Sequence, residues 1–489
     1  METKTTAMEK KYTEAGVLGS GPCNLDKLNG RLHFIGIGGI GMSALARLIL
    51  NRGIAVSGSD KQGNKITDDL TKAGALIYTG HTASNASGAA GIVVSTAITS
   101  DNPELNWARA NNLPVWHRSE ILAALAEHKK LIAISGTHGK TTTTAMIGKI
   151  FIDSNLDPSI VIGGVLPLLQ SNCRVGGGDY FIAEADESDG THVTLPAEIA
   201  VITNIEADHL ENYPAGMEQI LDTMKLFADK ANTVIVCTDD AGCQKIIPDL
   251  KSKVIGYGLR QKETEDPGIK TTYQFKDISD ATNSLMKVYR KNKVLGTVNL
   301  SVPGIHNQYN ALATIATAVE SGIDFETVAQ SLANFDGVDR RFQIIGTAKN
   351  ILVVDDYAHH PTEVIALLQA AQQYVAQGKF AARRVVAVFQ PHQPGRLKDF
   401  WKEFSEAFKA CDLLLVTDIY IARGGAIAGI DSKRFCEEVN NANSHYVPGP
   451  TSELATKVKV FLEPNDLVIT IGAGDITNIG PELLQLLRS

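Results

Sequence analysis

The hydrophobic residues of this chain fall into short apolar runs separated by longer amphipathic stretches. An apolar run of about four to eight residues that ends at glycine or a polar residue is typical of a buried parallel strand. The stretches between the runs carry apolar residues at helical spacing. This alternation predicts an α/β fold with open, mostly parallel sheets, and strands at residues 31–35, 54–59, 91–94, 131–135, 180–183, 198–205, 351–354, 384–389, 412–417 and 466–471.

At 489 residues the chain is too long for a single hydrophobic core, and its length suggests about three domains. The pattern divides it into a flexible polar extension at 1–27, a Rossmann-like nucleotide-binding domain at 28–120, a central P-loop ATPase-like domain at 121–338 and a C-terminal Rossmann-like domain at 339–489. The extension lacks the apolar segment of a signal peptide. Residues 263–293 are polar, and we expect them to be irregular and peripheral.

The composition is that of an ordinary globular protein, with 44% hydrophobic and 20% charged residues. A net charge of −8 argues against a general nucleic-acid binder, which needs clustered lysine and arginine. The six cysteines show no CxxC pair, which disfavours a zinc site or a disulfide framework and suits a reducing cytoplasm. No apolar stretch reaches membrane-spanning length. We therefore expect a cytoplasmic protein that acts on small molecules, with no nucleic-acid or membrane partner.

The strongest candidate site is a strand, turn and helix at residues 131–144. The apolar strand breaks at Gly136, and after a tight polar turn a helix begins near Lys140. Backbone N–H groups at such a helix start converge on an anion, Lys140 would reach the outer phosphates, and the Thr141 hydroxyl can bind Mg2+. The loop is a shortened relative of the usual P-loop, because Ile134 stands where that motif has its first glycine. The alternative is an ordinary turn that contains a lysine.

Candidate metal ligands follow the next two predicted strands. Glu184 follows strand 180–183 and opens an acidic segment, and His209 comes soon after strand 198–205. A carboxylate at the C-terminal end of a strand beside a phosphate loop is where nucleotide triphosphatases hold their metal. We favour Glu184 as the ligand, because it lies closest to the strand end, over the alternative of a solvated loop. A single histidine is usually structural, but His209 shares the sheet edge of Glu184.

The first domain opens with a second glycine-rich turn. Residues 36–41 form the pattern G-x-G-x-x-G between a strand and a helix, and Asp60 stands where a ribose-binding acid is expected. This motif alone would suggest NAD, but it requires only a nucleotide diphosphate at a helix N-terminus. The small residues Ser95 and Thr96 follow another strand, and they either line the same cleft or form a plain turn.

Further polar clusters occur in the second half of the chain. His306, Asn307 and Asn310 open an alanine-rich helix, where they could read an adenine edge or cap the helix. In the third domain, polar residues follow strands 351–354 and 384–389. Functional groups gather at such a carboxyl edge of a parallel sheet.

Five motifs occur in order: Gly-Thr-His-Gly-Lys-Thr at 136–141, Glu-Ala-Asp-Glu-Ser-Asp at 184–189, Asn-Ile-Glu-Ala-Asp-His at 204–209, Pro-Gly-x-His-Asn at 303–307 and Asp-Asp-Tyr-Ala-His-His-Pro at 355–361. Their combination resembles the Mur ligase family, and the resemblance covers nearly all of residues 30–478. The segment His-Phe-Ile-Gly-Ile-Gly-Gly-Ile-Gly-Met-Ser at 33–43 is most similar to the members that use L-alanine.

The resemblance implies a ligase that depends on ATP and Mg2+. Such an enzyme would join L-alanine to the lactyl carboxylate of UDP-N-acetylmuramate through an acyl phosphate, releasing ADP and phosphate, in peptidoglycan precursor synthesis. It also implies a UDP-sugar domain, an ATPase domain and a C-terminal amino-acid domain that closes over the other two.

The resemblance further implies roles for individual residues. Catalytic roles fall to Lys140, His209, Arg341 and His359. Nucleotide contacts fall to Gly136, Thr137, His138, Gly139, Lys140, Thr141, Thr142, His306, Asn307, Asn310 and Arg341. The UDP substrate would contact Gly36, Gly38, Gly39, Gly41, Ser59, Asp60, Ser95 and Thr96. Tyr357, His359 and Arg396 would line the amino-acid pocket, and Thr141, Glu184 and His209 would bind the metal.

The chain departs from the family pattern at Gln393, where members commonly carry arginine after the histidine of a Gln-Pro-His motif. Only Arg396 then remains to hold the carboxylate of the amino acid. Other classes stay open: a related ligase that attaches a whole murein peptide to the same sugar nucleotide, an NAD-dependent dehydrogenase, or a non-catalytic nucleotide sensor. We expect a monomer or a weak homodimer.

Overall fold

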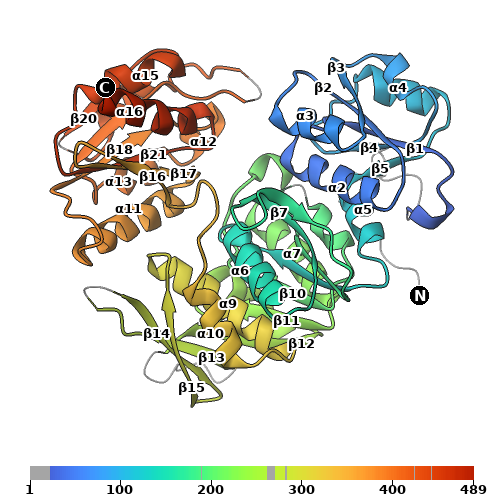
Figure 1. The fold of residues 1–489 in the computed structure, drawn as a ribbon, viewed down its shortest axis with the longest axis horizontal. Coiled ribbons are helices and arrows are strands. Elements are labelled where there is room, and N and C mark those ends of the chain that lie inside the picture. The colour runs from blue at the N-terminus through green and yellow to red at the C-terminus, as the bar shows by residue number, and fades with distance from the viewer. Residues whose placement is uncertain (1–22, 189, 261–269, 281–282, 423–424, 442) are drawn as a thin grey trace. The chain divides into compact units, whose positions relative to one another are not determined.

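The computed structural model describes residues 23–188, 190–260, 270–280, 283–422, 425–441 and 443–489. It divides into two compact units, residues 1–274, 290–293 and 312–328 in one and 275–289, 294–311 and 329–489 in the other (Figure 1). The predicted flexible extension lies outside the described residues up to residue 22, after which Leu25–Lys27 form a short 3-10 helix. Among the described residues, we find no helix with the length and apolar character needed to cross a membrane.

The first sheet has five parallel strands in the order β3-β2-β1-β4-β5. The strand order reverses between β1 and β4, and ligands of such sheets bind outside the carboxyl ends of the strands at this point. The loops that begin at Gly36 and Ser95 follow these two strands, so the predicted Rossmann-like domain is confirmed. The elements are β1 (Arg31–Ile35), α2 (Ile40–Asn51), β2 (Val56–Asp60), α3 (Lys65–Lys72), β3 (Leu76–Thr79), β4 (Ala89–Val94), α4 (Pro103–Ala110), β5 (Val115–His117) and α5 (Arg118–Leu125).

The central sheet has ten strands in the order β15-β14-β13-β12-β11-β10-β6-β9-β7-β8. Strands β12, β11, β10, β6, β9 and β7 pair in parallel, and β8 is antiparallel at the edge. The strands are β6 (Lys130–Ser135), β7 (Ser159–Leu166), β8 (Ser171–Arg174), β9 (Tyr180–Glu184), β10 (Ile199–Ile202), β11 (Thr233–Cys237), β12 (Lys253–Leu259), β13 (Thr271–Asp277), β14 (Ser284–Arg290) and β15 (Lys293–Leu300). The helices are α6 (Lys140–Asp153), α7 (Met217–Asp229), α8 (Ala241–Ile246), α9 (Ile305–Glu320) and α10 (Phe325–Ala333).

The prediction that residues 263–293 are irregular was wrong. Strands β13 and β14 occupy much of this segment, while residues 261–269 and 281–282 lie outside the described part. Tyr273 and Phe275 are fully buried in β13, as are Met286 and Val288 in β14. Each pair shows the alternation of a strand with one buried face. The polar residues between them concealed this period.

The third sheet runs β16-β17-β21-β18-β19-β20, with β16 antiparallel to β17 and the other pairs parallel. The last strand inserts between β17 and β18, so the order differs from that of the first sheet. The α/β class is confirmed. The elements are β16 (Gln343–Ala348), β17 (Ile351–Asp356), α11 (Pro361–Ala376), β18 (Arg384–Phe389), α12 (Pro394–Asp399), α13 (Trp401–Ala407), β19 (Leu413–Val416), α14 (Ser432–Glu438), β20 (Ser444–Tyr446), α15 (Thr451–Lys459), β21 (Asp466–Ile471) and α16 (Ile479–Arg488).

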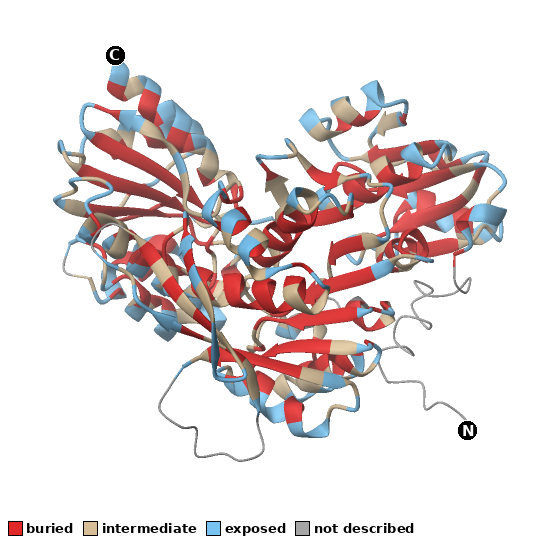
Figure 2. Ribbon diagram, turned by 60° about the horizontal axis from the view of Figure 1, so that its bottom comes forward, coloured by how far each residue is buried: buried red, intermediate tan, exposed pale blue. Residues whose placement is uncertain are grey.

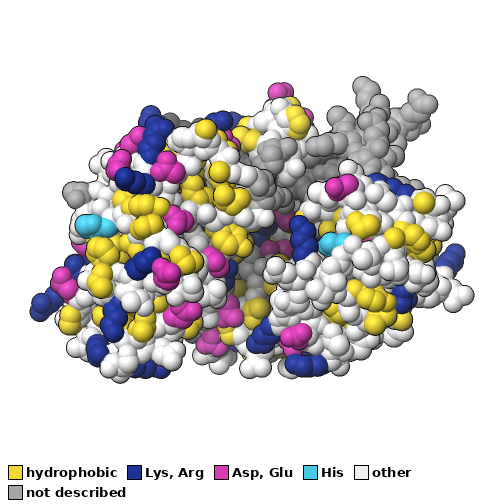
Figure 3. Space-filling model, turned by 90° about the horizontal axis from the view of Figure 1, so that it is seen from above, with side chains coloured by type: hydrophobic (Ala, Val, Ile, Leu, Met, Phe, Trp, Pro, Cys, Tyr) yellow, Lys and Arg dark blue, Asp and Glu magenta, His cyan; other side chains and the backbone are white. Residues whose placement is uncertain are grey.

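Both faces of the inner strands are covered by hydrophobic side chains. Along β17, Leu352 and Val354 pack in one hydrophobic cluster, and Ile351 and Val353 pack in another. Successive side chains of a strand point to opposite faces, so the two clusters lie on the two sides of the sheet. Figure 2 shows the strands as largely buried, whereas many helices are exposed along one side. On the face drawn in Figure 3, acidic and basic side chains are interspersed.

Candidate active site

The phosphate loop joins β6 to α6, and its backbone requires glycine at two positions. Gly136 has a φ of +126°, and a Cβ there would lie 2.2 Å from Thr203 Oγ1 and 2.8 Å from Asn204 O. Gly139 has a φ of 85° at the N-cap of α6, which begins at Lys140 as predicted. Glycine alone adopts such angles without strain. The turn therefore passes the segment after β10 too closely for a side chain, and the first N–H groups of α6 lie at the loop.

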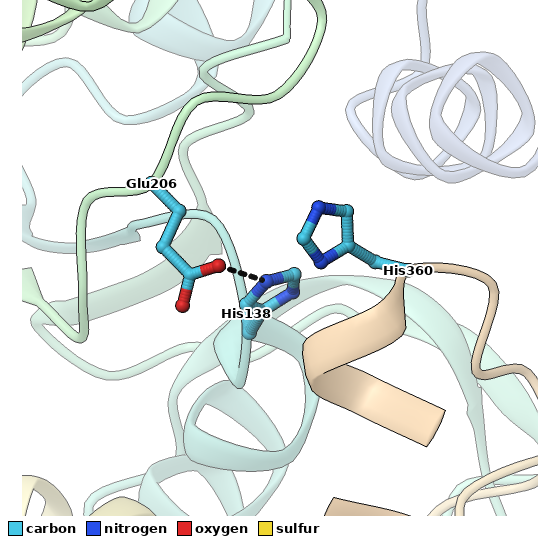
Figure 4. A group of neighbouring side chains, drawn as sticks. All are labelled: His138, Glu206 and His360. Carbon is cyan, nitrogen blue, oxygen red and sulfur yellow. Dashed lines mark hydrogen bonds and ion pairs between the residues drawn. The ribbon is translucent and has the colours of Figure 1, made fainter. Parts of the chain in front are cut away.

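Hydrogen bonds fix this loop to the segment after β10. The backbone N–H groups of Thr137 and His138 donate to Asn204 O at 3.1 Å and Asn204 Oδ1 at 2.8 Å. Thr203 Oγ1 and Asn204 Nδ2 both donate to His138 O, at 2.6 and 3.0 Å. His138 Nε2 lies 3.4 Å from Glu206 Oε2, the interaction dashed in Figure 4. The conformation of the loop is thus set by the protein itself.

Lys140 lies within its own loop. Its Nζ donates to Gly136 O at 2.6 Å, Thr137 O at 3.1 Å and Glu187 Oε1 at 2.9 Å. Burial alone would lower the pKa of Lys140, but the carboxylates of Glu187 and Asp186 outweigh it and hold the pKa above its ordinary value. The ammonium is therefore charged at neutral pH, as a phosphate ligand requires.

The acidic segment after β9 surrounds this lysine. Glu187 is only 5% exposed, and burial raises its pKa although Lys140 acts in the opposite direction. Asp186 Oδ2 accepts a hydrogen bond from Arg118 Nη2 at 2.8 Å. Burial acts to raise the pKa of Asp186, but Arg118 and Lys140 hold it well below its usual range. The contacts of Glu187 and Arg118 escaped sequence analysis, because they depend on how the turn after β9 folds.

Glu184, the predicted metal ligand, ends β9, and its Oε1 accepts a hydrogen bond from Gly163 N at 2.7 Å. Its negative charge also contributes to the raised pKa of Lys140. Thr141 is the second residue of α6. Hydroxyl and carboxylate oxygens are hard ligands of the kind that Mg2+ prefers. The residues at this loop therefore fit a magnesium ion.

His209, the other predicted metal ligand, follows β10 in a left-handed conformation with a φ of 53°. Its backbone N–H donates to Asp208 Oδ1 at 2.8 Å, and its Nε2 lies 3.6 Å from Asp208 Oδ2. A neighbouring carboxylate commonly orients a histidine that binds metal.

The glycine-rich turn of the first domain closes onto the end of β2. Gly36 N and Ile37 N both donate to Ser59 O, at 2.8 and 3.0 Å. Gly38 N donates to Asp60 Oδ2 at 2.9 Å, and a Cβ on Gly38 would lie 2.8 Å from that oxygen. The predicted ribose-binding acid thus contacts the turn itself. The side chain of Ser59, predicted to contact the UDP substrate, is fully buried, and its hydroxyl donates to Glu104 Oε2 at 2.5 Å.

The other residues predicted to contact the UDP substrate lie at the same edge of the first sheet. Gly39 is the N-cap of α2. Ser95 and Thr96 come directly after β4, and they are partly and largely exposed, respectively. This position suits residues that line a ligand cleft at the switch point.

Arg118 connects the glycine-rich turn with the phosphate loop. It is the first residue of α5, its Nη2 bonds Asp186, and its Nη1 lies 3.7 Å from where a Cβ on Gly41 would stand. In the same unit, Asn172 of β8 donates to Ser43 Oγ of α2 at 3.3 Å. The guanidinium that bonds the acidic segment beside Lys140 therefore lies close to the start of α2.

In the second unit, the predicted amino-acid residues gather after β17. The centres of the Tyr357 and His359 rings lie 5.1 Å apart, and the Arg341 guanidinium lies 5.4 Å from the centre of the Tyr357 ring. His359 Nδ1 lies 3.0 Å from Tyr357 O and 3.4 Å from Glu363 Oε2. Burial lowers the pKa of His359 to about 3, so the ring is neutral at neutral pH. With Nδ1–H donating to the carbonyl, Nε2 is the acceptor of this ring.

The Gln393 segment borders this group. Gln393 has a φ of 68° before α12, and its backbone N–H donates to Tyr420 O at 2.9 Å. The His392 ring stacks on the Tyr420 ring, with 5.8 Å between the ring centres. It also contacts the His359 ring edge-on, again with 5.8 Å between the centres. The charge of Arg396 contributes to the lowered pKa of His359. Sequence analysis missed Tyr420, because it follows a strand with no recognisable motif.

The residues proposed to read adenine open α9. Asn307 Nδ2 donates to Pro303 O at 2.6 Å, and Asn310 Nδ2 donates to Asn307 Oδ1 at 3.3 Å. Both asparagines are buried. These bonds are of the local kind that stabilises a helix start.

His306, near the start of this helix, should make the stability of the protein depend on pH. Burial and the charge of Arg341 lower the pKa of His306 from 6.5 to about 4. Between these values the unfolded chain binds the extra proton, so acid favours unfolding. From pH 7 to pH 5, we expect the free energy of unfolding of the wild type to fall by about 1 to 2 kcal/mol relative to His306→Gln. Chemical denaturation of both proteins measures this, and a constant difference would contradict the assignment.

Comparison with known proteins assigns the chain to a family. Three family models match consecutive segments: the Mur ligase family catalytic domain over residues 31–130, the Mur ligase middle domain over 134–318 and the Mur ligase glutamate ligase domain over 340–474. The UDP-N-acetylmuramate--L-alanine ligase of Geobacter sp. (strain M21) is 40% identical over 470 residues, with 94% of this chain and 98% of that one covered. The protein of the same name from Myxococcus xanthus (strain DK1622) is 40% identical over 471 residues, with 94% and 95% covered.

A solved structure agrees with these matches. The crystal structure of UDP-N-acetylmuramate-alanine ligase from Thermotoga maritima superposes with a TM-score of 0.79 at 28% identity, and the match covers 94% of this chain and 99% of that one. The murein peptide ligase of Psychrobacter arcticus, at 22% identity and a TM-score of 0.68, shares the fold. The resemblance inferred from the motifs is confirmed, and the chain belongs to the Mur ligase family.

Proposed function

We propose that the protein joins L-alanine to the lactyl carboxylate of UDP-N-acetylmuramate, with cleavage of ATP to ADP and phosphate, in peptidoglycan precursor synthesis. The observation that carries this proposal is the position of Arg118, between the start of α2 and the acidic segment beside Lys140. An enzyme that phosphorylates the carboxylate of a nucleotide sugar must hold both nucleotides close together. The relatives that are 40% identical carry the name of this activity.

In the first step, the phosphate loop would bind ATP for phosphoryl transfer to the carboxylate. A carboxylate with a pKa of about 4 is ionised at neutral pH and has no usable leaving group. Phosphorylation by ATP converts it to an acyl phosphate, which an amine can attack. Lys140 would exchange its contact with Glu187 for the phosphates of ATP and neutralise their charge. Thr141, Glu184 and His209 would hold Mg2+, which supplies further charge neutralisation when bound.

The second step requires a neutral amine. The ammonium of L-alanine must lose a proton before nitrogen attacks the acyl carbon, and phosphate then leaves from a tetrahedral intermediate. We infer that the neutral His359 ring takes this proton at Nε2 and passes the proton on its Nδ1 to the Glu363 carboxylate, which lies 3.4 Å from that nitrogen. Its pKa of about 3 means that it would hold the proton only briefly. Arg396 would hold the carboxylate of the amino acid.

The metal assignment predicts a change in the Mg2+ requirement. Glu184→Gln keeps an oxygen for the hydrogen bond from Gly163 but removes the negative charge. We expect the Mg2+ concentration for half-maximal phosphate release to rise at least about tenfold. Glu198→Gln is the matched control, because Glu198 is a carboxylate beside the same sheet whose Oε2 accepts from Asn232 at 2.7 Å. Equal Mg2+ dependence of Glu184→Gln and wild type would remove Glu184 from the metal site.

We place the reaction in the cytoplasm and expect the chain to act on small molecules as a monomer or a weak homodimer. The six cysteines are free thiols, as suits a reducing compartment. Sedimentation of the purified chain across a range of concentrations tests the oligomeric state, and a stable larger assembly would contradict this expectation.

Phosphate release from ATP in the presence of UDP-N-acetylmuramate and Mg2+, with each of the twenty amino acids in turn, tests the proposed function. We expect L-alanine to support release and amide formation. Release that requires a murein tripeptide would instead identify the related peptide ligase. Phosphate release in the absence of any amino acid would overturn the proposal. So would the absence of phosphate release with all of the amino acids.

A further inference from the structure

A buried polar cluster lies beneath the glycine-rich turn of the first domain. At its centre is Glu104, the second residue of α4, whose side chain is fully buried. Its Oε2 accepts a hydrogen bond from Ser59 Oγ at 2.5 Å and lies 3.3 Å from His33 Nε2. Its Oε1 accepts a hydrogen bond from Asn85 Nδ2 at 2.7 Å. One carboxylate therefore joins α4 to β1, β2 and the segment between β3 and β4.

Two histidines complete the cluster. His33 Nδ1 lies 2.8 Å from Ser57 Oγ, and His81 Nδ1 lies 3.0 Å from Ser59 Oγ and 3.5 Å from Glu104 Oε2. Burial alone would raise the pKa of Glu104, but the hydrogen bonds of the cluster, led by that of His33, lower it below its ordinary value. The carboxylate is therefore ionised at neutral pH. A buried charge is retained only where such bonds offset its loss of hydration.

The cluster connects to the turn through the backbone of Ser59. The Ser59 carbonyl accepts the N–H groups of Gly36 and Ile37, at 2.8 and 3.0 Å, while its hydroxyl is held by Glu104. The loop that begins at Ser95 leads directly into α4 and so to Glu104. The same carboxylate therefore supports both loops at the switch point of the first sheet.

We propose that Glu104 is a positioning residue for the nucleotide sugar, holding the turn at 36–41 and the loop after β4 in the conformation that binds it. The inference rests on the proposed function, since it takes the diphosphate of UDP-N-acetylmuramate as the ligand of this turn. Glu104 itself is fully buried and acts through Ser59. Oε2 of Glu104 faces the Ser59 hydroxyl and Oε1 faces the Asn85 amide, and a carboxylate can accept a hydrogen bond at each of its two oxygens.

Glu104→Gln tests this role. One oxygen becomes an NH2 group that cannot accept from its former donor, and Ser59 or Asn85 loses a charge-assisted bond. We expect the KM for UDP-N-acetylmuramate to rise about tenfold, with the KM for ATP and the kcat at saturating nucleotide sugar within about twofold of wild type. Ser59→Ala should raise the same KM. The double variant should be no worse than the stronger single variant, because both changes break one connection.

Glu320→Gln is the matched control. Glu320 is a carboxylate of α9 that accepts hydrogen bonds from Tyr273 Oη at 2.9 Å and Arg290 Nη2 at 2.6 Å. We expect this variant to be less stable and to keep the wild-type KM for the nucleotide sugar. A merely structural role for Glu104 would give the same result, because partial unfolding reduces the amount of active enzyme without changing KM.

An unchanged KM in both Glu104→Gln and Ser59→Ala would overturn the proposal, and Ser59→Ala still tests it if Glu104→Gln fails to fold. Calorimetric titration with UDP-N-acetylmuramate separates this inference from the proposed function. If the wild type makes no amide yet binds this ligand, the proposed function fails, and weaker binding by the variants still supports the positioning role. Equal affinity of wild type and variants would reject that role. A wild type that does not bind the ligand would reject both.

Discussion

Lys140→Ala is expected to slow phosphate release from ATP at least about hundredfold and to leave the affinity for UDP-N-acetylmuramate nearly unchanged. Lys140 is the cation of the phosphate loop, and the loss of one such transition-state donor costs about 3 to 4 kcal/mol. The backbone bonds that hold the glycine-rich turn, from Gly36 and Ile37 to Ser59 O and from Gly38 to Asp60, do not involve the lysine. Single-turnover assays measure the first quantity, and calorimetric titration measures the second.

The substitution also leaves Glu187 buried without the ammonium that now lies 2.9 Å away. Removal of one partner from a buried ion pair costs about 3 to 5 kcal/mol of stability. Lys140→Ala combined with Glu187→Gln should therefore regain stability without regaining activity. Lys149→Ala is the matched control, because Lys149 lies on the same helix and pairs with Asp153 at 2.9 Å. Near-normal turnover of Lys140→Ala would refute the role given to the loop.

Gly136→Ala is expected to lower phosphate release by about a hundredfold, because displacement of a catalytic loop by about 1 Å has an effect of that size. The added methyl group would lie 2.2 Å from Thr203 Oγ1, and the backbone φ of +126° at position 136 is unfavourable for alanine. The loop and the segment after β10 must therefore move apart. Calorimetric titration with ATP should show weaker binding together with the slower rate.

The control for this change is Gly63→Ala, in the loop between β2 and α3. No heavy atom lies nearer than 3.9 Å to an added Cβ at that position, so no clash results. We expect phosphate release close to that of the wild type. If Gly136→Ala were as active as this control, the tight passage beside the segment after β10 would not matter for ATP binding.

Parts of the fold could be predicted because the signal is local. Strands β1, β18 and β21 have the predicted bounds, since each is an apolar run that ends abruptly at polar or glycine residues. Helix α6 begins at Lys140, as the turn before it indicated. Strands β13 and β14 were missed, because each buries only alternate residues among polar neighbours.

In the candidate site, too, local motifs could be predicted and contacts between distant segments could not. The glycine-rich turns and Lys140 could be predicted, because their residues are neighbours in sequence. The partners that fix them could not. Ser59 and Glu104 are 45 residues apart, and Arg118 and Asp186 are 68 residues apart. No periodicity relates residues at such separations, and only the packing of the sheets brings them together.

The central claim is that ATP phosphorylates the carboxylate of the nucleotide sugar before the amine attacks. UDP-N-acetylmuramate labelled with 18O at both lactyl carboxylate oxygens tests it, with mass spectrometry of the released phosphate and of the new amide. The account predicts one labelled oxygen in the phosphate and one in the amide. Formation of the amide with unlabelled phosphate would contradict it.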